Sequence, residues 1–293
     1  MTIRPRRSVL YMPGSNARAM EKARTLPVDG VILDLEDSVA PDAKAQARHA
    51  TVNAVKTGGF GHREVIIRIN GLDTEWGSDD LTAAAAAAPD AILVPKVSSP
   101  DQLELIGQRL FDTHTDLHTR IWVMIETPLA ILNAAAIAEG AKDSETRLSG
   151  FVMGTNDLAK ETRARIVPGR APMVPWLMGC IAAARISGIG ILDGVYNAIG
   201  DADGFVRECV QARDFGFDGK TLIHPSQIGP CNEAFSPTPE EVGEARKIIA
   251  AFERPENRDK GVVALDGRMI ERMHADMARR TVAMAEAIAA QRA

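Results

Sequence analysis

The stretch GVILDLEDSVAP, residues 30–41, joins an apolar run to three carboxylates within four positions. The run 30–35 has the length and the hydrophobicity of a strand that is buried on both faces. Asp34, Glu36 and Asp37 stand at its end, where like charges repel one another and resist removal from water. Such a strand end requires either water or a cationic partner beside its carboxylates.

Seven further apolar runs resemble this one, and they alternate with segments of helical character. The eight expected strands are residues 8–12, 30–35, 64–69, 91–94, 121–125, 150–153, 188–192 and 220–223. The expected helices between them are residues 16–25, 41–56, 78–88, 100–111, 128–139, 174–187 and 202–215. Apolar strands that alternate with helices indicate a parallel sheet covered on both faces, so eight such units predict a (β/α)8 TIM barrel.

The chain continues beyond the eighth unit. We expect the barrel to occupy residues 1–235 and a C-terminal helical extension to occupy residues 236–293. One helix is expected to run through Phe252, and a last helix from about Met269 to Ala290. The simplest role for Asp266 is to cap the N-terminus of that last helix. The extension is expected either to cover one mouth of the barrel or to reach a neighbouring subunit.

Composition narrows the class of protein. Of 293 residues, 45% are apolar and 25% charged, which is typical of a globular enzyme. The net charge is −5 and the 34 basic residues are scattered, so we expect no nucleic-acid partner. No stretch has the length of a membrane span, and the basic run 4–7 lacks the apolar segment of a signal peptide. The cysteines Cys180, Cys209 and Cys231 match no metal spacing, and we expect free thiols in a cytoplasmic protein.

Chemistry in an α/β barrel gathers where the strands end. All eight expected ends carry polar or turn residues, and seven carry an ionisable side chain. In order they read Met12-Pro13-Gly14, Glu36-Asp37, Arg68-Ile69-Asn70, Pro95-Lys96, Glu126-Thr127, Gly154-Thr155-Asn156-Asp157, Asp193-Gly194 and His224-Pro225. The carboxylates of the opening stretch are therefore expected to face a shared polar mouth.

Two of these strand ends suggest a metal site. Glu126 ends the fifth strand and Asp157 follows the sixth, so their side chains are expected to converge. Two carboxylates that leave positions for water and substrate suit Mg²⁺, and the absence of a neighbouring His argues against zinc. Either carboxylate has a structural alternative, as a helix cap or as the partner of a Lys or Arg.

Three other features have a functional and a structural interpretation. Arg68 is suited to bind a substrate carboxylate with its planar fork, or to pair with Asp34 or Glu36, and both can hold at once. The turn 15–18 precedes a helix, where amides favour phosphate but any helix needs an N-cap. We interpret His224 as a packed or hydrogen-bonded residue.

These residues together resemble the citrate lyase β-subunit and malyl-CoA lyase family, within the HpcH/HpaI aldolase group. The resemblance covers nearly the whole chain. It lies in "RRSVLYMPGSNARAM", "DGVILDLEDSVAPDAKAQAR", "VIIRIN", "ILVPKV", "WVMIETPLAILNAAAIA", "FVMGTNDL", "GFDGKTLIHPSQI" and "GVVALDGRMIE". The order of the Asp-Leu-Glu-Asp-Ser-Val, Ile-Glu-Thr and Gly-x-x-Asp elements is highly specific.

The resemblance implies a Mg²⁺-dependent carbon–carbon lyase that splits or forms a 3-hydroxyacyl-CoA, such as malyl-CoA or citramalyl-CoA. The products would be acetyl-CoA and a 2-oxo acid: glyoxylate, pyruvate or oxaloacetate. The resemblance also implies a role for each site residue. Glu126 and Asp157 would hold the metal, and Glu36 and Asp37 would hydrogen-bond metal-bound water or orient the site. Arg68 would bind the oxo-acid carboxylate together with amides at Gly154, Thr155 and Asn156, and Ser15, Asn16 and Arg18 would contact the CoA phosphates.

Two departures from the family pattern matter. The family usually ends in Gly-x-Met-Ile-Asp, and that Asp reaches an adjacent subunit's site as acid or base, whereas this chain has Glu271 there. The longer side chain keeps the carboxyl group but displaces it, and Glu271 is otherwise a solvated helix residue. His224 and Asp266 stand where citrate lyase β-subunits tend to have Asn, which favours a free-standing CoA-thioester enzyme.

Four alternatives remain open on the sequence alone. A thioesterase of malyl-CoA-type esters would use the same metal and arginine. A citryl-thioester lyase subunit, a non-catalytic CoA-binding subunit and a pyruvate-class aldolase without CoA are the others. If the C-terminal extension completes a neighbour's site, the resemblance implies a homotrimer or hexamer.

Overall fold

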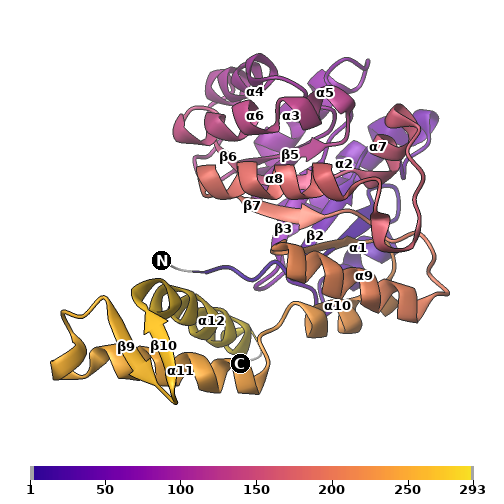
Figure 1. Ribbon diagram of the computed structural model, residues 1–293. Helices are drawn as coiled ribbons and strands as arrows, with labels where there is room; N and C mark the ends of the chain where they lie inside the picture. Colours follow the sequence, from indigo (N-terminus) through magenta and orange to yellow (C-terminus); the bar gives the residue numbers. More distant parts are fainter. Residues whose placement is uncertain (1–2, 292–293) are drawn as a thin grey trace. The chain divides into compact units, whose positions relative to one another are not determined.

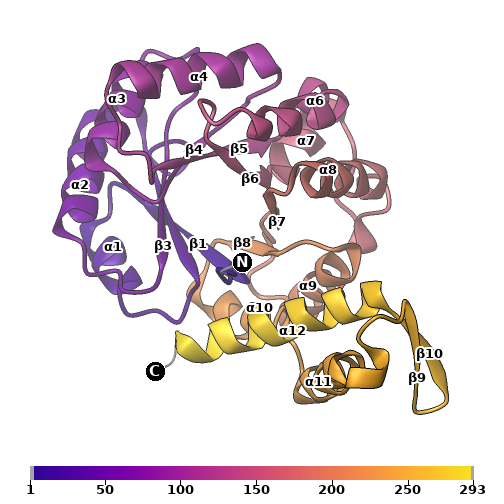
Figure 2. The same ribbon diagram turned by 90° about the vertical axis from the view of Figure 1, so that its left-hand side faces the viewer.

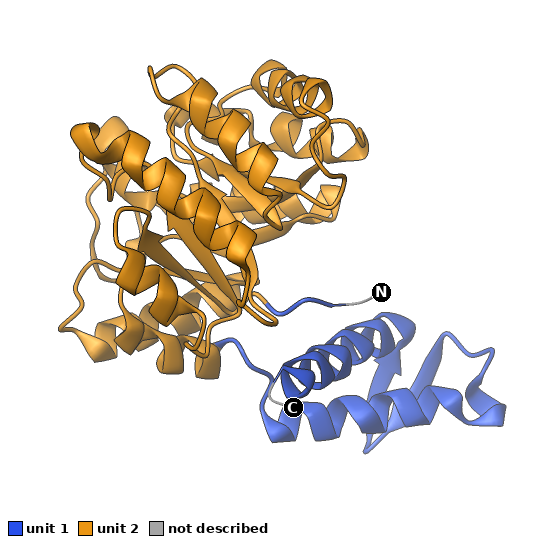
Figure 3. Cartoon of the chain, turned by 180° about the vertical axis from the view of Figure 1, so that it is seen from behind, with its two compact units in different colours: residues 1–5, 235–293 blue, residues 6–234 orange. Residues whose placement is uncertain are grey.

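The computed structural model describes residues 3–291 of the chain. Residues 6–234 form one compact unit, orange in Figure 3, which we describe first; residues 1–5 and 235–293 belong to a second, blue in Figure 3. The first unit contains the barrel with its surrounding helices, and the second contains the C-terminal extension (Figure 1). The role of the extension as a cover for a neighbour's site stays a prediction.

The first unit is a closed barrel of eight parallel strands, which confirms the predicted fold. Each strand pairs with the next along the chain, and β8 pairs with β1. Figure 2 shows the helices arranged around the strands. The strands are β1 (Ser8–Pro13), β2 (Gly30–Asp34), β3 (Glu64–Arg68), β4 (Ala91–Val94), β5 (Arg120–Ile125), β6 (Leu148–Met153), β7 (Gly190–Asp193) and β8 (Gly219–Leu222).

Helices follow the strands nearly where the pattern predicts them. They are α1 (Ala17–Ala23), α2 (Lys44–Thr57), α3 (Gly77–Ala87), α4 (Pro100–Asp112), α5 (Pro128–Leu132), α6 (Ala134–Glu139), α7 (Thr155–Thr162), α8 (Val174–Ser187), α9 (Ala202–Phe215) and α10 (Ile228–Ala234). The single helix predicted over 128–139 is interrupted at Asn133, whose side-chain amide donates to the Ser98 carbonyl at 2.8 Å. Helices α7 and α10 were not predicted.

Alternation along the strands fills the barrel with apolar side chains and places polar ones at its mouth. The interior cluster comprises Val9, Ile32, Ile66, Ala91, Leu93, Trp122, Met124, Val152 and Leu192, with Tyr11 packed against it. Asp34 and Arg68 each follow an interior isoleucine by two positions, so their side chains share its face. Strand register sets Asp34 directly opposite Arg68. The two charges therefore meet because of the barrel's pairing.

The second unit is a helical pair with a β-hairpin. Helix α11 (Pro239–Glu253) precedes strands β9 (Val262–Leu265) and β10 (Arg268–Glu271), and α12 (Arg272–Ala290) follows. A small core forms from Ala251, Phe252, Val263, Ile270 and Ala275. The prediction that the last helix begins near Met269 is wrong, because this residue lies in β10.

The role predicted for Asp266 is also wrong. Asp266 and Gly267 form the two-residue turn between β9 and β10, with φ of 50° and 77°. Asp-Gly is a favoured sequence for turns that need two positive φ angles. Asp266 therefore closes a hairpin, and Glu271 is the residue that precedes α12.

Two expectations from composition bear on the described residues. None of their helices combines the length and the hydrophobicity that a membrane crossing needs. Cys180, Cys209 and Cys231 are free and buried, as expected. Burial raises the pKa of the Cys180 thiol to about 12, so this thiol stays protonated and unreactive.

Candidate active site at the mouth of the barrel

A cavity of about 270 Å³ opens at the carboxyl ends of the strands, within the first unit. Several residues named from the sequence line it: Asp37, Arg68, Gly154, Thr155, Asn156 and Asp157. The other lining residues are Tyr11, Asp34, Ser38, Met124, Met153, Val195, Asn197, Thr221 and Ile223. The polar mouth expected from the strand ends therefore exists as a cavity.

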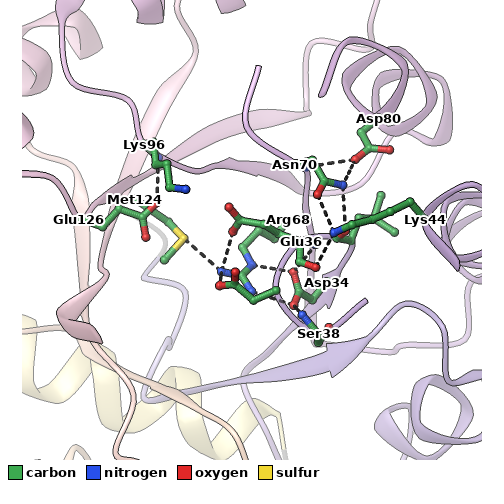
Figure 4. A network of polar contacts seen from close by, with 12 residues as sticks. Asp34, Glu36, Ser38, Lys44, Arg68, Asn70, Asp80, Lys96, Met124 and Glu126 are labelled. Carbon is green, nitrogen blue, oxygen red and sulfur yellow. Dashed lines mark hydrogen bonds and ion pairs between the residues drawn. The ribbon is translucent and has the colours of Figure 1, made fainter. Parts of the chain in front are cut away.

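Arg68 is the cationic partner of the three carboxylates in the opening stretch. Its Nε and Nη2 donate to the two carboxylate oxygens of Asp34, at 2.6 and 2.7 Å. Its Nη1 lies 2.8 Å from a Glu36 oxygen and 3.1 Å from an Asp37 oxygen (Figure 4). Arg68 is only 6% exposed, so these pairs lie largely out of water. The structural interpretation of Arg68 is confirmed, and its role toward a substrate stays a prediction.

Asp34 is an ionised anchor rather than a reacting group. Besides Arg68, it accepts hydrogen bonds from the backbone amides of Glu36, at 2.9 Å, and Ser38, at 3.1 Å. Burial acts to raise the pKa of Asp34, but the Arg68 charge and these hydrogen bonds hold that pKa below its usual range. Asp34 thus fixes both Arg68 and the loop that carries Glu36.

Lys44 also holds the loop that carries Glu36 in place. Its ammonium group donates to the carbonyl oxygens of Leu35, at 2.8 Å, and Glu36, at 2.7 Å. The third donor reaches the Asn70 side chain at 2.7 Å (Figure 4). The sequence reading missed Lys44; a lysine in the helix that follows the acidic strand end was its only signal. Lys44 is a positioning residue for Glu36.

Glu126 directly follows β5 and is buried; it does not itself line the cavity. One of its oxygens accepts the backbone N–H of Lys96 at 2.8 Å (Figure 4). Residue 154 must be glycine here, because a Cβ at that position would lie 2.5 Å from the second Glu126 oxygen. Burial, and then the charge of Asp157, raise the pKa of Glu126 to about 7. The contact with Gly154 and the influence of Asp157 show that the fifth and sixth strand ends converge as predicted.

The carboxyl group of Glu36 also has a raised pKa. Burial raises the pKa of Glu36 to about 8; Arg68 opposes the rise, whereas Glu126 and Asp37 add to it. Burial and the neighbouring carboxylates thus disfavour the charged forms of Glu36 and Glu126, and Arg68 and Lys96 offset this imbalance only in part. A divalent cation would relieve that imbalance, and an all-oxygen donor set suits Mg²⁺.

The donor set fits a magnesium ion that keeps open positions. Among the described residues no group of three or more His, Cys, Asp or Glu side chains is placed to hold a metal ion. Two protein carboxylates with waters or substrate in the other positions are the usual arrangement for Mg²⁺. Glu126 and Asp157 are the residues that would hold it.

The residues predicted to meet CoA phosphates lie apart from the cavity lining. Ser15, Asn16 and Arg18 are exposed at the start of α1, on the loop after β1. The side chain of Asn16 accepts the Ala19 amide at 3.0 Å, so it caps that helix. The capping alternative is confirmed for Asn16, and a contact of this turn with CoA stays a prediction.

Glu271 and His224 are the last two residues that the sequence analysis singled out. Glu271 is exposed in the second unit, and its backbone N–H donates to Nδ1 of His274 at 3.0 Å. His224 is hydrogen-bonded, as predicted: its Nδ1 lies 2.8 Å from the Ser226 hydroxyl. His224 therefore caps a turn, and the catalytic role of Glu271 stays a prediction.

The sequence reading missed the apolar and neutral walls of the cavity. Tyr11 and Thr221 stand on β1 and β8, and Met124 and Met153 on β5 and β6. Residues two positions apart in a strand lie on the same face. Tyr11 could therefore have been inferred from Val9, and Met124 from Trp122. The other walls come from loops whose path no strand pattern specifies.

A second group of buried charges lies outside the cavity lining. Asp193 accepts from Arg170 Nη1 and Lys220 Nζ, each at 2.7 Å. The Lys220 ammonium also reaches Glu208 at 2.7 Å. Asp193 follows the interior residue Leu192, so its side chain faces the outer side of the barrel wall. This strand end, expected at the mouth, serves as a structural brace.

Comparison with known proteins gives a consistent result. Residues 7–225 match the HpcH/HpaI aldolase/citrate lyase family. A (3S)-malyl-CoA thioesterase from Cereibacter sphaeroides (strain KD131 / KCTC 12085) is 50% identical over 289 residues, which cover 99% of this chain and 98% of that protein. The citrate lyase subunit beta of Escherichia coli (strain K12) is 33% identical and covers 97% and 94% of the respective chains.

Solved structures agree. Protein CitE from Mycobacterium tuberculosis, in complex with magnesium, acetoacetate and coenzyme A, matches with a TM-score of 0.76 at 27% identity. The match covers 96% of this chain and 98% of that one. A citrate lyase from Burkholderia xenovorans LB400 matches with a TM-score of 0.83 at 20% identity, which supports the fold alone. The resemblance stated from the sequence is confirmed at the level of the family.

Proposed function

Because the chain belongs to the HpcH/HpaI aldolase/citrate lyase family, we propose that it is a magnesium-dependent enzyme that hydrolyses a malyl-CoA-type thioester. The relative named a thioesterase shares half of its residues along almost the full length of both chains. This support favours hydrolysis over the carbon–carbon cleavage that the sequence resemblance put first. The observation that supports metal dependence is the raised pKa of Glu36 and of Glu126, together with the charge of the cavity residue Asp157, which acts on Glu126.

Glu126 and Asp157 would hold the metal. When bound there, Mg²⁺ would supply positive charge that holds the carboxylate and the hydroxyl oxygen of the acid. Lys96 fixes one Glu126 oxygen through its backbone, and Gly154 leaves room for the other. The chain thus sets the direction of this carboxylate before any ligand arrives.

The other cavity residues are suited to a small anionic acid. The first amides of α7, at Thr155 and Asn156, lie at a helix N-terminus, where a carboxylate is favoured. Arg68 adds positive charge, and Asp37, whose side chain is 71% exposed, is the partner it can release most readily. A cavity of 270 Å³ lies just below the roughly 300–1,000 Å³ of drug-sized sites, so the acid fits inside and CoA extends outside.

Proton transfer is assigned to Glu36. A carboxyl group whose pKa lies near 8 exchanges protons close to neutral pH, and Lys44 holds the Glu36 backbone in place. Glu271 is proposed as a second acid or base that reaches the site of a neighbouring copy. That role requires a homo-oligomer, for which we propose a trimer or hexamer.

A carbon–carbon lyase is the second candidate. Relatives named citrate lyase subunit beta, from Leuconostoc mesenteroides and Escherichia coli, are 30% and 33% identical to this chain. Such a lyase would split the same class of thioester with the same metal and the same arginine, and would release acetyl-CoA and an oxo acid.

Product analysis separates the two reactions. Purified protein with Mg²⁺ is incubated with (3S)-malyl-CoA and with citramalyl-CoA, and free CoA, acetyl-CoA and the acids are quantified. We expect free CoA with an equal amount of malate or citramalate, and no product after chelation of the metal. Acetyl-CoA with an equal amount of glyoxylate or pyruvate would replace hydrolysis by the lyase reaction. No product from either thioester would overturn both candidates.

A further inference from the structure

The chain has two tyrosines, and their hydroxyl groups are in different states. The Tyr196 hydroxyl donates to Asp201 at 2.6 Å, and Tyr196 does not line the cavity. Tyr11 lines the cavity, and its hydroxyl has no hydrogen-bond partner among the described residues. The hydroxyl oxygen of Tyr11 is not one of the buried side-chain atoms that lack a hydrogen-bond partner. Because it lacks a partner and is not fully buried, it is exposed to the cavity. It is a free donor at the candidate active site.

The ring of Tyr11 is held firmly. Tyr11 lies in the middle of β1, opposite Ile32 of β2, and packs against the interior cluster. The Arg68 guanidinium lies over its face, 4.9 Å from the ring centroid. A cation over an aromatic face is attracted to it, so Arg68 helps to hold the Tyr11 ring in place.

The hydroxyl keeps its proton at any physiological pH. Burial raises the pKa of Tyr11 well above its usual value. The charges of Asp34, Glu126 and Glu36 act in the same direction, and Arg68 alone opposes them. A neutral phenol in such surroundings donates a hydrogen bond without losing its proton.

The position of Tyr11 indicates which substrate oxygen it meets. Around the closed ring β1 lies four strands from β5, so Tyr11 stands across the cavity from Glu126. The proposed metal and the α7 amides occupy that far wall and take the carboxylate end of the acid. The thioester end then falls near Tyr11.

Arg68 alone is poorly placed to stabilise that end. Its Nε and Nη2 are engaged by Asp34, and its Nη1 by Glu36 and Asp37. Any charge that develops on the thioester oxygen needs a donor that is not already paired. The Tyr11 hydroxyl meets this requirement.

We propose that the Tyr11 hydroxyl donates a hydrogen bond to the thioester carbonyl oxygen and stabilises the negative charge that develops there. The inference rests on the proposed function, because it assumes a CoA thioester as substrate. In hydrolysis, water adds to the carbonyl carbon and gives a proton to the ionised Glu36 carboxylate, while the C=O electron pair moves onto this oxygen. That pair re-forms the double bond as the C–S bond breaks, and the CoA thiolate leaves and takes up the proton. In the lyase reaction the same oxygen carries the enolate charge, so one donor serves both candidates.

The test compares Tyr11→Phe with Tyr196→Phe as a matched control. Each variant loses one hydroxyl and keeps the ring. With (3S)-malyl-CoA and Mg²⁺, we expect Tyr11→Phe to lower kcat by about 100-fold, the usual loss of one oxyanion donor, with little change in KM. Calorimetry should show unchanged binding of malate with Mg²⁺, because the carboxylate end does not meet Tyr11. Tyr196→Phe should behave as wild type in both assays.

The contradicting outcomes are distinct. A Tyr11→Phe enzyme with wild-type kcat would overturn this inference and leave the proposed function intact. Weaker malate binding with unchanged kcat would show that the hydroxyl meets the carboxylate instead, which also overturns it. A wild-type protein that turns over neither malyl-CoA nor citramalyl-CoA would overturn the proposed function and this inference together.

Discussion

Two groups of charged side chains in the same barrel differ in their balance. The mouth cluster consists of Asp34, Glu36, Asp37, Arg68 and Glu126, in which four carboxylates accompany one arginine, and Lys96 adds a positive charge near two of them. The brace cluster consists of Asp193, Glu208, Arg170 and Lys220, in which two carboxylates accompany two cations. Both lie at the ends of barrel strands and use the same kinds of side chain.

The balance decides how the carboxyl groups titrate. In the brace cluster burial acts to raise the pKa of Asp193, but Lys220 and Arg170 hold that pKa below its usual value. In the mouth cluster burial raises the pKa of Glu36 to about 8 and that of Glu126 to about 7. Paired charges stabilise the fold, whereas an unmatched excess of carboxylates beside a cavity marks a place prepared for a cation.

The largest effect is expected when the brace cluster is broken. Asp193→Ala leaves Lys220 and Arg170 buried without their shared partner, and loss of one member of a buried pair costs about 3–5 kcal/mol. Urea unfolding followed by circular dichroism measures this loss. Calorimetric Mg²⁺ affinity of the folded variant should match wild type; a parallel fall in metal affinity would contradict the separation of the two clusters.

The mouth cluster should respond in the opposite way. Glu126→Gln removes a charge that burial and Asp157 disfavour, so the metal-free protein should be as stable as wild type or more so. Mg²⁺ affinity should fall by at least about 10–100-fold, measured by calorimetry. Glu64→Gln is the matched control, because Glu64 is a buried carboxylate of β3 that pairs with Arg6 at 2.7 Å. That control should lose stability and keep its metal affinity; the reverse pattern would refute the assignment.

The smallest effect concerns pH. The ordinary carboxyl pKa is 4.5, and the folded values for Glu126 and Glu36 are about 7 and 8. Between these limits the metal-free folded state keeps protons that the unfolded chain has lost, so its stability falls as pH rises. Mg²⁺ requires the ionised groups, so its affinity should rise by less than about tenfold between about pH 7 and pH 8.

Thermal unfolding with and without Mg²⁺ at both pH values measures this change. The stabilisation by the metal should be larger at the higher pH and lost in the Glu126→Gln variant. An equal stabilisation at both pH values would show that these carboxyl groups are already ionised without metal.

The sequence predicted the architecture because periodicity is local information. Apolar runs such as 30–35, alternating with helices, indicate a parallel sheet covered on both faces, and strand ends then indicate where Glu126, Asp157 and Arg68 gather. The acidic stretch also indicated that water or a cation must lie beside it. These inferences need only the order of residues along each strand.

Local patterns were less informative in the C-terminal extension. The residues from 262 to 271 form a hairpin around Asp266 and Gly267. The sequence pattern had instead predicted that Asp266 caps the start of the last helix. Ile270 packs in the small core of that unit, where pairing with β9 holds it. A short apolar segment beside a helix fits either structure until its packing partner is known.

Which charges pair was decided only by the tertiary structure. Asp34 and Arg68 are neighbours because strand register sets them opposite each other, and Asp193 is neutralised by Lys220 and Arg170, which lie 27 and 23 positions away along the chain. The free hydroxyl of Tyr11 and the brace from Lys44 likewise depend on neighbours brought together by closure of the barrel. Sequence determines which groups reach the mouth, but the energy of a buried charge depends on what surrounds it in space, and only the folded chain supplies those neighbours.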